Sequence, residues 1–162
     1  MAARAGRAAL IGLLALVLGA ASTGAQPMEE RYPGPYHAEV LRVIDGDTIE
    51  VRVAIWPGLL ADWSVRLRGV DSPETFRPAC LREDLMGRAA RAFVARRYAP
   101  GDTIRLLDVE RGDFAGRVIA DIRRWRSDRW LSLAQEMVEA RVAWPWRPGL
   151  PPIPWCRLGR GR

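Results

Sequence analysis

Histidine is almost absent from this chain, and lysine is missing altogether. Among the 162 residues there is one histidine, His37, and all 25 basic residues are arginine. Enzymes that depend on a histidine base, or on a metal centre with several histidine ligands, are therefore hard to build from this sequence. We interpret His37 as a structural or surface residue.

Cysteine is nearly as scarce, with only Cys80 and Cys156. Two thiols so far apart in sequence are too few for a zinc site, which takes about four ligands. In an oxidising compartment two cysteines usually pair. If the chain is exported, we therefore expect a Cys80–Cys156 disulfide that holds the proline-rich tail, residues 147–162, against the body.

The first 25 residues suggest export. Arg4 and Arg7 precede an apolar run at residues 8–21, and the small residues of STGAQ follow. This order is typical of a secretory signal peptide, and the run is shorter than the roughly 20 residues of a membrane span. We expect cleavage near Ala25 and a periplasmic or secreted product that is free of the membrane; an uncleaved N-terminal anchor is the alternative.

Arginine gives the chain a positive charge of +6. Without Arg4 and Arg7, 23 basic residues remain against 19 acidic ones, a net charge of +4. A basic domain favours anionic partners, and nucleic acid is the first to consider. We predict no stable protein partner and expect a monomer.

Hydrophobic periodicity predicts mostly strands. Apolar alternation and β-branched residues predict five main strands, at residues 36–45, 48–56, 64–71, 102–110 and 117–125, the last pairing with the short segment RWLSL. Residues 57–63 are expected to form a loop with an apolar tip. Helical spacing predicts a helix over residues 80–99, and Ser132 is expected to cap a second helix that ends near Ala140.

This element order predicts an α+β, mainly β, fold. A five-stranded Greek-key barrel of the OB-fold type, with two or three helices packed on it, accommodates the strands and helices in this order. We place the domain at residues 33–146, between the signal peptide at 1–25 and the tail at 147–162.

The segment RVIDGDTIEV, residues 42–51, places two carboxylates around a glycine. One interpretation is a hairpin turn, since Asp-Gly between alternating residues is a strong hairpin signal and Asp47 would then be solvated. The other is a metal ligand on a bent strand. The choice depends on whether chemical partners exist elsewhere in the chain.

Two further segments supply such partners. VRLRGVDSPET, residues 65–75, carries Arg66, Asp71 and Glu74 at or just after a predicted strand, and DFAGRVIA, residues 113–120, carries Arg117 after a glycine. Each segment alone is equally consistent with turn residues and solvated arginines.

Taken together, these side chains suit phosphodiester hydrolysis. Asp47 and Asp71 are hard oxygen ligands that fit Ca²⁺ or Mg²⁺ rather than zinc. Arginine grips phosphate oxygens in a bidentate manner and offsets charge in a transition state. A further carboxylate, Glu74, can take a proton from attacking water. Three acids are few for two metals, so we expect one.

The ordered set VIDGDTI, VRLRGVDSPET and GRV resembles the staphylococcal nuclease-like, or thermonuclease, family over about residues 36–146. The resemblance implies an OB-like barrel and a secreted endonuclease that cleaves DNA and RNA with little sequence preference, leaving 3′-phosphate ends. It implies that Asp47, Asp71 and the carbonyl of Ser72 bind Ca²⁺, in preference to Mg²⁺. It also implies that Arg66 and Arg117 hold the scissile phosphate and that Glu74 handles the attacking water.

The chain departs from the family pattern at several positions. Phe114 and Ala115 stand where the family usually has a lysine and a tyrosine. These help to hold a terminal phosphate in the founding enzyme, so their absence puts end-binding and exonuclease action in doubt. Arg141 stands where the family often has a glycine at the end of a helix. We expect Asp113, and Trp146 near a base-stacking position of the family, to contact substrate.

A second hypothesis is a non-catalytic OB-fold module that binds nucleic acid through a basic groove and aromatic stacking. Carboxylates in a phosphate groove would repel the ligand of such a module. The complete acid and arginine set therefore favours a nuclease.

Overall fold

The computed structural model describes residues 31–113 and 115–158, so the predicted signal peptide, residues 1–25, lies outside the described residues. The elements in chain order are β1 (Arg31–Tyr32), β2 (Tyr36–Val43), β3 (Thr48–Trp56), β4 (Leu59–Leu67), β5 (Val70–Asp71), α1 (Leu81–Ala95), β6 (Thr103–Arg111), β7 (Arg117–Arg126), β8 (Arg129–Ser132), α2 (Leu133–Glu139) and β9 (Trp144–Pro145).

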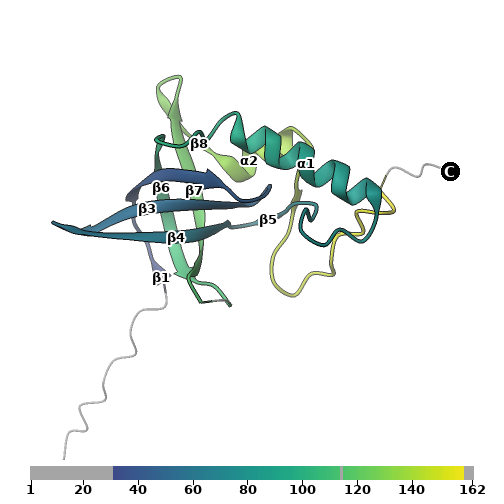
Figure 1. Cartoon of the computed structure of the whole chain (residues 1–162), viewed down its shortest axis with the longest axis horizontal. Helices are drawn as coiled ribbons and strands as arrows, with labels where there is room; N and C mark the ends of the chain where they lie inside the picture. Colours follow the sequence, from purple (N-terminus) through teal and green to yellow (C-terminus); the bar gives the residue numbers. More distant parts are fainter. Residues whose placement is uncertain (1–30, 114, 159–162) are drawn as a thin grey trace, which may run out of the picture.

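Five of the strands close into a barrel. In the main sheet the strands follow the order β1-β6-β2-β3-β4-β7-β8, and an additional pairing of β6 with β7 closes the ring. Within the ring only β4 and β7 run parallel; the other four neighbouring pairs are antiparallel. The prediction of a mainly β, OB-fold-like barrel with helices packed on it is confirmed (Figure 1).

The strand alternation fills the barrel with aliphatic side chains. In β3, for example, Ile49, Val51 and Val53 are buried, and β4 adds Val65 and Leu67. A barrel whose outer surface is exposed to solvent requires this alternation of inward and outward side chains. Helix α1 contributes buried residues to the same core, and both helices lie toward the end of the molecule opposite the tip of the β3–β4 hairpin (Figure 1).

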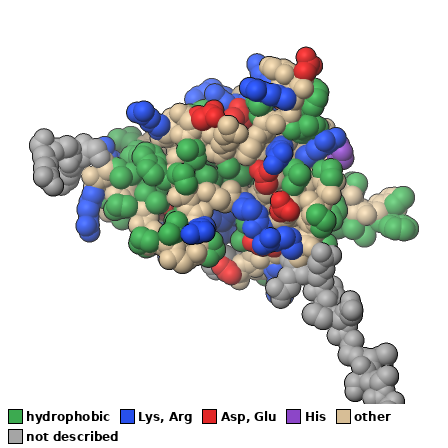
Figure 2. All heavy atoms as spheres, turned by 180° about the vertical axis from the view of Figure 1, so that it is seen from behind, with side chains coloured by type: hydrophobic (Ala, Val, Ile, Leu, Met, Phe, Trp, Pro, Cys, Tyr) green, Lys and Arg blue, Asp and Glu red, His purple; other side chains and the backbone are tan. Residues whose placement is uncertain are grey.

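The β3–β4 hairpin is longer than the sequence suggested. The expected loop at 57–63 is wrong, because β4 begins at Leu59 and only Pro57 and Gly58 form the turn, with Gly58 at φ +82°. The predicted third strand, 64–71, is divided in two by Arg68 and Gly69. The tip keeps its apolar character, with Trp56 73 % exposed, and Figure 2 shows hydrophobic side chains on this projecting end.

Both predicted helices are present, and each ends earlier than expected. Helix α1 ends at Ala95, four residues before the predicted end, and α2 ends one residue before Ala140. Ser132 is the N-cap residue of α2 as predicted, but its hydroxyl donates to Asp121 Oδ1 rather than accepting a hydrogen bond from the helix.

The predicted disulfide is present. Cys80 and Cys156 are bonded, with Cα atoms 6.1 Å apart and a sequence separation of 76 residues. In the chain-entropy model, closing a loop of that length stabilises the fold by about 4 to 5 kcal/mol as an upper figure. The bond indicates an oxidising, extracytoplasmic environment. Within residues 31–113 and 115–158, neither helix is long and apolar enough to cross a membrane.

Arg141 occupies a position that favours glycine. Its φ is +56°, and the end of α2 forms a Schellman motif in which Arg141 N donates to Val138 O and Val142 N donates to Met137 O. A residue with a Cβ in this left-handed conformation is strained by roughly 1 kcal/mol relative to glycine.

We therefore predict that Arg141→Gly raises the free energy of unfolding by about 1 kcal/mol, or the melting temperature by roughly 3 °C. Arg141→Ala is the matched control, because alanine keeps the Cβ and should show no such gain. Equal melting temperatures for the glycine and alanine variants, measured by circular dichroism, would show that the backbone at Arg141 is not strained.

Candidate active site

The Asp-Gly-Asp segment connects two strands and is also buried. Residues 44–47 join β2 to β3, and Ile44 N donates to Thr48 O at 3.0 Å, so a hairpin connection is present. However, Asp47 is only 3 % exposed, which excludes a solvated turn residue. A Cβ built on Gly46 would lie 2.7 Å from Ser72 Oγ and 2.8 Å from Ala90 Cβ. Glycine at this position therefore permits the close approach of α1 and the segment after β5.

The buried Asp47 carboxylate has three hydrogen-bond donors. Oδ1 accepts from Thr48 Oγ1 at 3.1 Å and from Arg66 Nη1 at 2.7 Å, while Oδ2 accepts from Ser72 N at 3.0 Å. The register of the sheet explains the arrangement, because Thr48 faces Arg66 across β3 and β4. A buried carboxylate needs such partners, since burial without them is costly.

Arg66 joins the two predicted metal ligands. Its Nη2 donates to Asp71 Oδ1 at 2.7 Å, the same distance as its Nη1 from Asp47 Oδ1. The side chains of Arg66 and Asp71 are 26 % and 27 % exposed, so the triad is reached from solvent on that side. The two carboxylates thus converge on one positive charge.

Asp45 belongs to the same acidic group and was not among the predicted site residues. Its Oδ1 accepts a hydrogen bond from Asp47 N at 3.1 Å. Burial, together with the charge of Asp47, raises the pKa of Asp45 to about 6. Burial and the charge of Asp47 also raise the pKa of Asp71, although Arg66 opposes this. Burial disfavours the charge of Arg66, yet Asp47 and Asp71 together raise its pKa.

The carboxylate oxygens of Asp47 and Asp71 fit a hard divalent cation. Within the described ranges, no three or more His, Cys, Asp or Glu side chains form a metal-binding group. Two carboxylates nevertheless already converge on one cationic group, the Arg66 guanidinium. Carboxylate and carbonyl oxygens are the ligands that Ca²⁺ prefers, and extracellular sites with few ligands bind it weakly.

Arg117 lies one strand away from Arg66 on the same face. In the parallel pair of β4 and β7, the register partner of Arg117 is Ser64, and that of Ile119 is Arg66. Because residues two apart on a strand share a face, Arg66 and Arg117 both point outward, about 7 Å apart along the strands. The structure therefore brings the two predicted phosphate-binding arginines to one surface.

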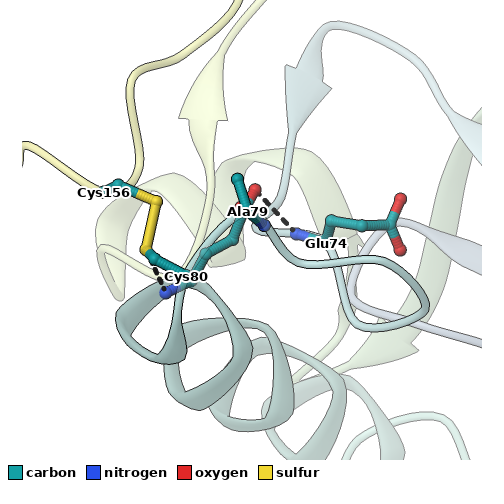
Figure 3. The surroundings of a disulfide bond; sticks show 5 residues. Glu74, Ala79, Cys80 and Cys156 are labelled. Atoms are coloured by element: carbon teal, nitrogen blue, oxygen red, sulfur yellow. Dashed lines mark hydrogen bonds between the residues drawn. A yellow bond between two sulfur atoms is a disulfide. The ribbon is translucent and has the colours of Figure 1, made fainter.

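Glu74 lies two residues beyond Ser72 and is held by its own loop. Its Oε1 accepts from the N–H groups of Thr75 and Phe76, each at 2.8 Å. The loop is fastened to α1 by Glu83, whose carboxylate accepts from Ala79 N at 2.7 Å and from Glu74 N at 3.5 Å. In Figure 3 the Glu74 carboxylate points away from the disulfide. Its role toward water stays a prediction.

The remaining predicted residues, Asp113 and Trp146, lie on two other segments. Asp113 is exposed in the turn between β6 and β7. The backbone N of Trp146 donates to Gly69 O at 3.0 Å, which places it beside the strand segment that carries Asp71, and base stacking by its ring stays a prediction. The loop of Glu74 also carries Phe76, which sequence analysis missed; its ring is 81 % exposed, with the Arg77 guanidinium 5.2 Å from the ring centroid.

Comparison with known proteins gave no relative for this site. No family model matches the chain, and no curated protein matches it.

The closeness of α1 to the Glu74 loop gives a prediction about Gly87. A Cβ there would lie 2.8 Å from the carbonyl oxygens of both Pro73 and Glu74. Gly→Ala inside an exposed helix usually stabilises by about 1 kcal/mol, but here the clash is with backbone. We predict that Gly87→Ala lowers the free energy of unfolding by roughly 1–3 kcal/mol, as overpacking does.

The exposed neighbour Ala89 is the control, because it measures the stability difference between alanine and glycine in the same helix turn without a clash. Ala89→Gly should lower the free energy of unfolding by about 1 kcal/mol. Denaturant unfolding measures both variants. If Gly87→Ala instead gains as much stability as Ala89→Gly loses, α1 is not in close contact with residues 73–75.

Proposed function

We propose that the chain is an exported, metal-dependent phosphodiesterase that hydrolyses DNA, with RNA as a second candidate substrate, at internal positions and with little sequence preference. The observation that carries this proposal is the triad in which Arg66 lies between the carboxylates of Asp47 and Asp71, at 2.7 Å from each. The motif resemblance to the staphylococcal nuclease-like family supports the same activity.

The two carboxylates would hold one Ca²⁺, together with the carbonyl of Ser72. The ion would supply Lewis-acid polarisation of a phosphate oxygen. With Asp47 and Asp71 committed to that ion, the Arg66 guanidinium can donate to phosphate instead. Its planar fork matches phosphate oxygens and stabilises charge that develops there.

The remaining roles follow from position. Arg117 extends from the same face as Arg66 and would donate to a second phosphate oxygen. Glu74, exposed on the segment that follows Ser72, would accept the proton of the attacking water. The Thr75 and Phe76 amides that donate to its Oε1 hold the carboxylate in place on this loop.

A groove lined by arginines at the end of β2 supports a polyanionic substrate. A pocket of about 440 Å³ between β2 and α1 is lined by Arg42, Arg88 and Arg91 among others. Arg42 and Arg88 are paired with acids, whereas Arg91 joins no ion pair within the described part of the chain. Arg91 Nη2 lies 3.5 Å from Val43 O, so the groove begins at the turn that carries Asp47.

The alternative is an OB-fold module that binds nucleic acid without cleaving it, and the exposed ring of Phe76 suits base stacking in either case. The two functions differ in their use of the acids. In a binding module, neutralising a carboxylate next to phosphate should strengthen binding; in a nuclease it should abolish cleavage.

The decisive experiment is digestion of plasmid and single-stranded DNA by the purified mature protein. We expect cleavage with Ca²⁺ and none with EDTA. Asp47→Asn keeps the size of a buried side chain but removes its charge, and should lower the cleavage rate by more than about 100-fold. Mutation of a residue that only hydrogen-bonds to a metal ligand already lowers metal affinity or activity by about 10–100-fold, and Asp47 is itself a proposed ligand. Asp62→Asn is the control, because Asp62 is an exposed acid on the hairpin, paired with Arg52.

A wild-type protein that binds but never cuts DNA with Ca²⁺ or Mg²⁺ would contradict the nuclease proposal and leave the binding module. Cleavage by Asp47→Asn at the wild-type rate would show that the Asp-Gly-Asp segment is only structural.

A second prediction concerns Arg66. Lysine keeps the charge but cannot donate to two partners with the geometry of a guanidinium. We expect Arg66→Lys to lower the cleavage rate by roughly 10²-fold or more, as does removal of a donor to a transition state. Arg52→Lys, which alters the exposed pair with Asp62, should leave the rate unchanged. If Arg66→Lys stays within a few-fold of wild type, Arg66 does not act on phosphate.

A further inference from the structure

The C-terminal segment returns to the candidate metal site, although the motifs end well before it. Strand β9 pairs with β5, so that Trp144 faces Asp71, and Trp146 N donates to Gly69 O. Further along the chain, the Trp155 side chain lies close enough to the Asp71 carboxylate to favour its charged form. We refer to residues 144–156 as the C-terminal strap. The strap therefore contacts Asp71 through both backbone and side chain.

Trp155 is fixed in place. Its side chain is 5 % exposed, and its ring packs edge-to-face on Trp144 with centroids 5.3 Å apart and planes at 83°. Its backbone N donates to Ile153 O at 2.9 Å. The Trp155 ring is therefore held in one place against Trp144, the residue that pairs with Asp71.

The disulfide holds this end of the strap. Cys156, the residue after Trp155, is bonded to Cys80, the N-cap residue of α1 (Figure 3). The Cys80 sulfur accepts from Glu83 N at 3.4 Å, and Glu83 in turn fastens the loop that carries Glu74. The bond thus joins the strap to the helix end that supports the site.

We propose that the C-terminal strap contributes to the metal site. In this proposal Trp155 is a positioning residue, whose indole N–H donates to the Asp71 carboxylate and fixes its orientation. This inference rests on the proposed function, since it assigns Asp71 to a metal ion. Asp71 Oδ1 accepts from Arg66, and the proposed hydrogen bond from the Trp155 indole N–H would restrain rotation of the same carboxylate. A donor behind a ligating carboxylate fixes its orientation, and loss of such a partner typically weakens metal binding by about 10–100-fold.

The test is calorimetric titration of Ca²⁺ into the full mature protein, without substrate. Wild type should bind with a Kd on the order of 10⁻⁴ M, as extracellular sites do. Trp155→Phe keeps an aromatic ring and removes the N–H, so its Kd should be about tenfold higher. Trp144→Phe is the matched control: it trims the same aromatic pair but leaves the Trp155 N–H in place, and its Kd should stay within about threefold of wild type.

A second measurement requires no substitution. Reduction of the disulfide in the wild-type protein, with release of the strap followed by tryptophan fluorescence, should also raise the Ca²⁺ Kd about tenfold. If Trp155→Phe does not fold, the Ca²⁺ Kd of the reduced wild-type protein tests the role of the strap instead.

The outcomes separate this inference from the proposed function. If wild type binds no Ca²⁺, the proposed metal site fails and the role of Trp155 fails with it. If wild type binds Ca²⁺ and Trp155→Phe binds within about twofold of it, the metal site stands and the positioning role is overturned. Equal losses in Trp155→Phe and Trp144→Phe would overturn it too, because they would show a packing effect only.

Discussion

The ion triad of Asp47, Arg66 and Asp71 is the interaction on which the arrangement of this site depends. A carboxylate as deeply buried as Asp47 must be compensated, and Arg66 and the Ser72 amide do so from two different segments. Removal of one partner from a buried ion pair typically costs about 3–5 kcal/mol, because the other charge is left uncompensated. The triad therefore holds the start of β3, the end of β4 and the segment after β5 in one geometry.

The surrounding packing serves the same geometry. Helix α1 approaches the Asp-Gly-Asp turn at Gly46 and the Glu74 loop at Gly87, and in both places a side chain would collide with neighbouring atoms. The strap pairs with β5 beside Asp71, and the disulfide holds the end of the strap. A small basic domain thus keeps Asp45, Asp47 and Asp71 close together, and burial, followed by repulsion from Asp47, raises the pKa of Asp45 and of Asp71. A divalent cation would relieve that repulsion.

The barrel could be predicted because its strands alternate, as Ile49, Val51 and Val53 do, and the disulfide because only two cysteines exist. The start of β4 could not be predicted from the sequence, because Leu59 and Leu60 are both exposed and show no alternation. Asp47 and Asp71 were found from the order of motifs, whereas the burial of Asp45 depends on α1 packing over the turn. The Trp155 contact joins residues 84 positions apart through a proline-rich segment without periodicity, so no local pattern predicts it. Arg141, which stands where the resembled family often has a glycine, has the positive φ that glycine favours.

The central claim is that Asp47 and Asp71 form one cation site, occupied by Arg66 until a metal ion binds. A crystal structure of the protein with Ca²⁺ and an uncleavable dinucleotide tests it most directly. The account predicts Ca²⁺ about 2.3–2.6 Å from oxygens of both carboxylates, with the Arg66 guanidinium moved onto the phosphate. A structure in which Arg66 still bridges the two carboxylates, while metal and nucleotide bind elsewhere, would contradict it.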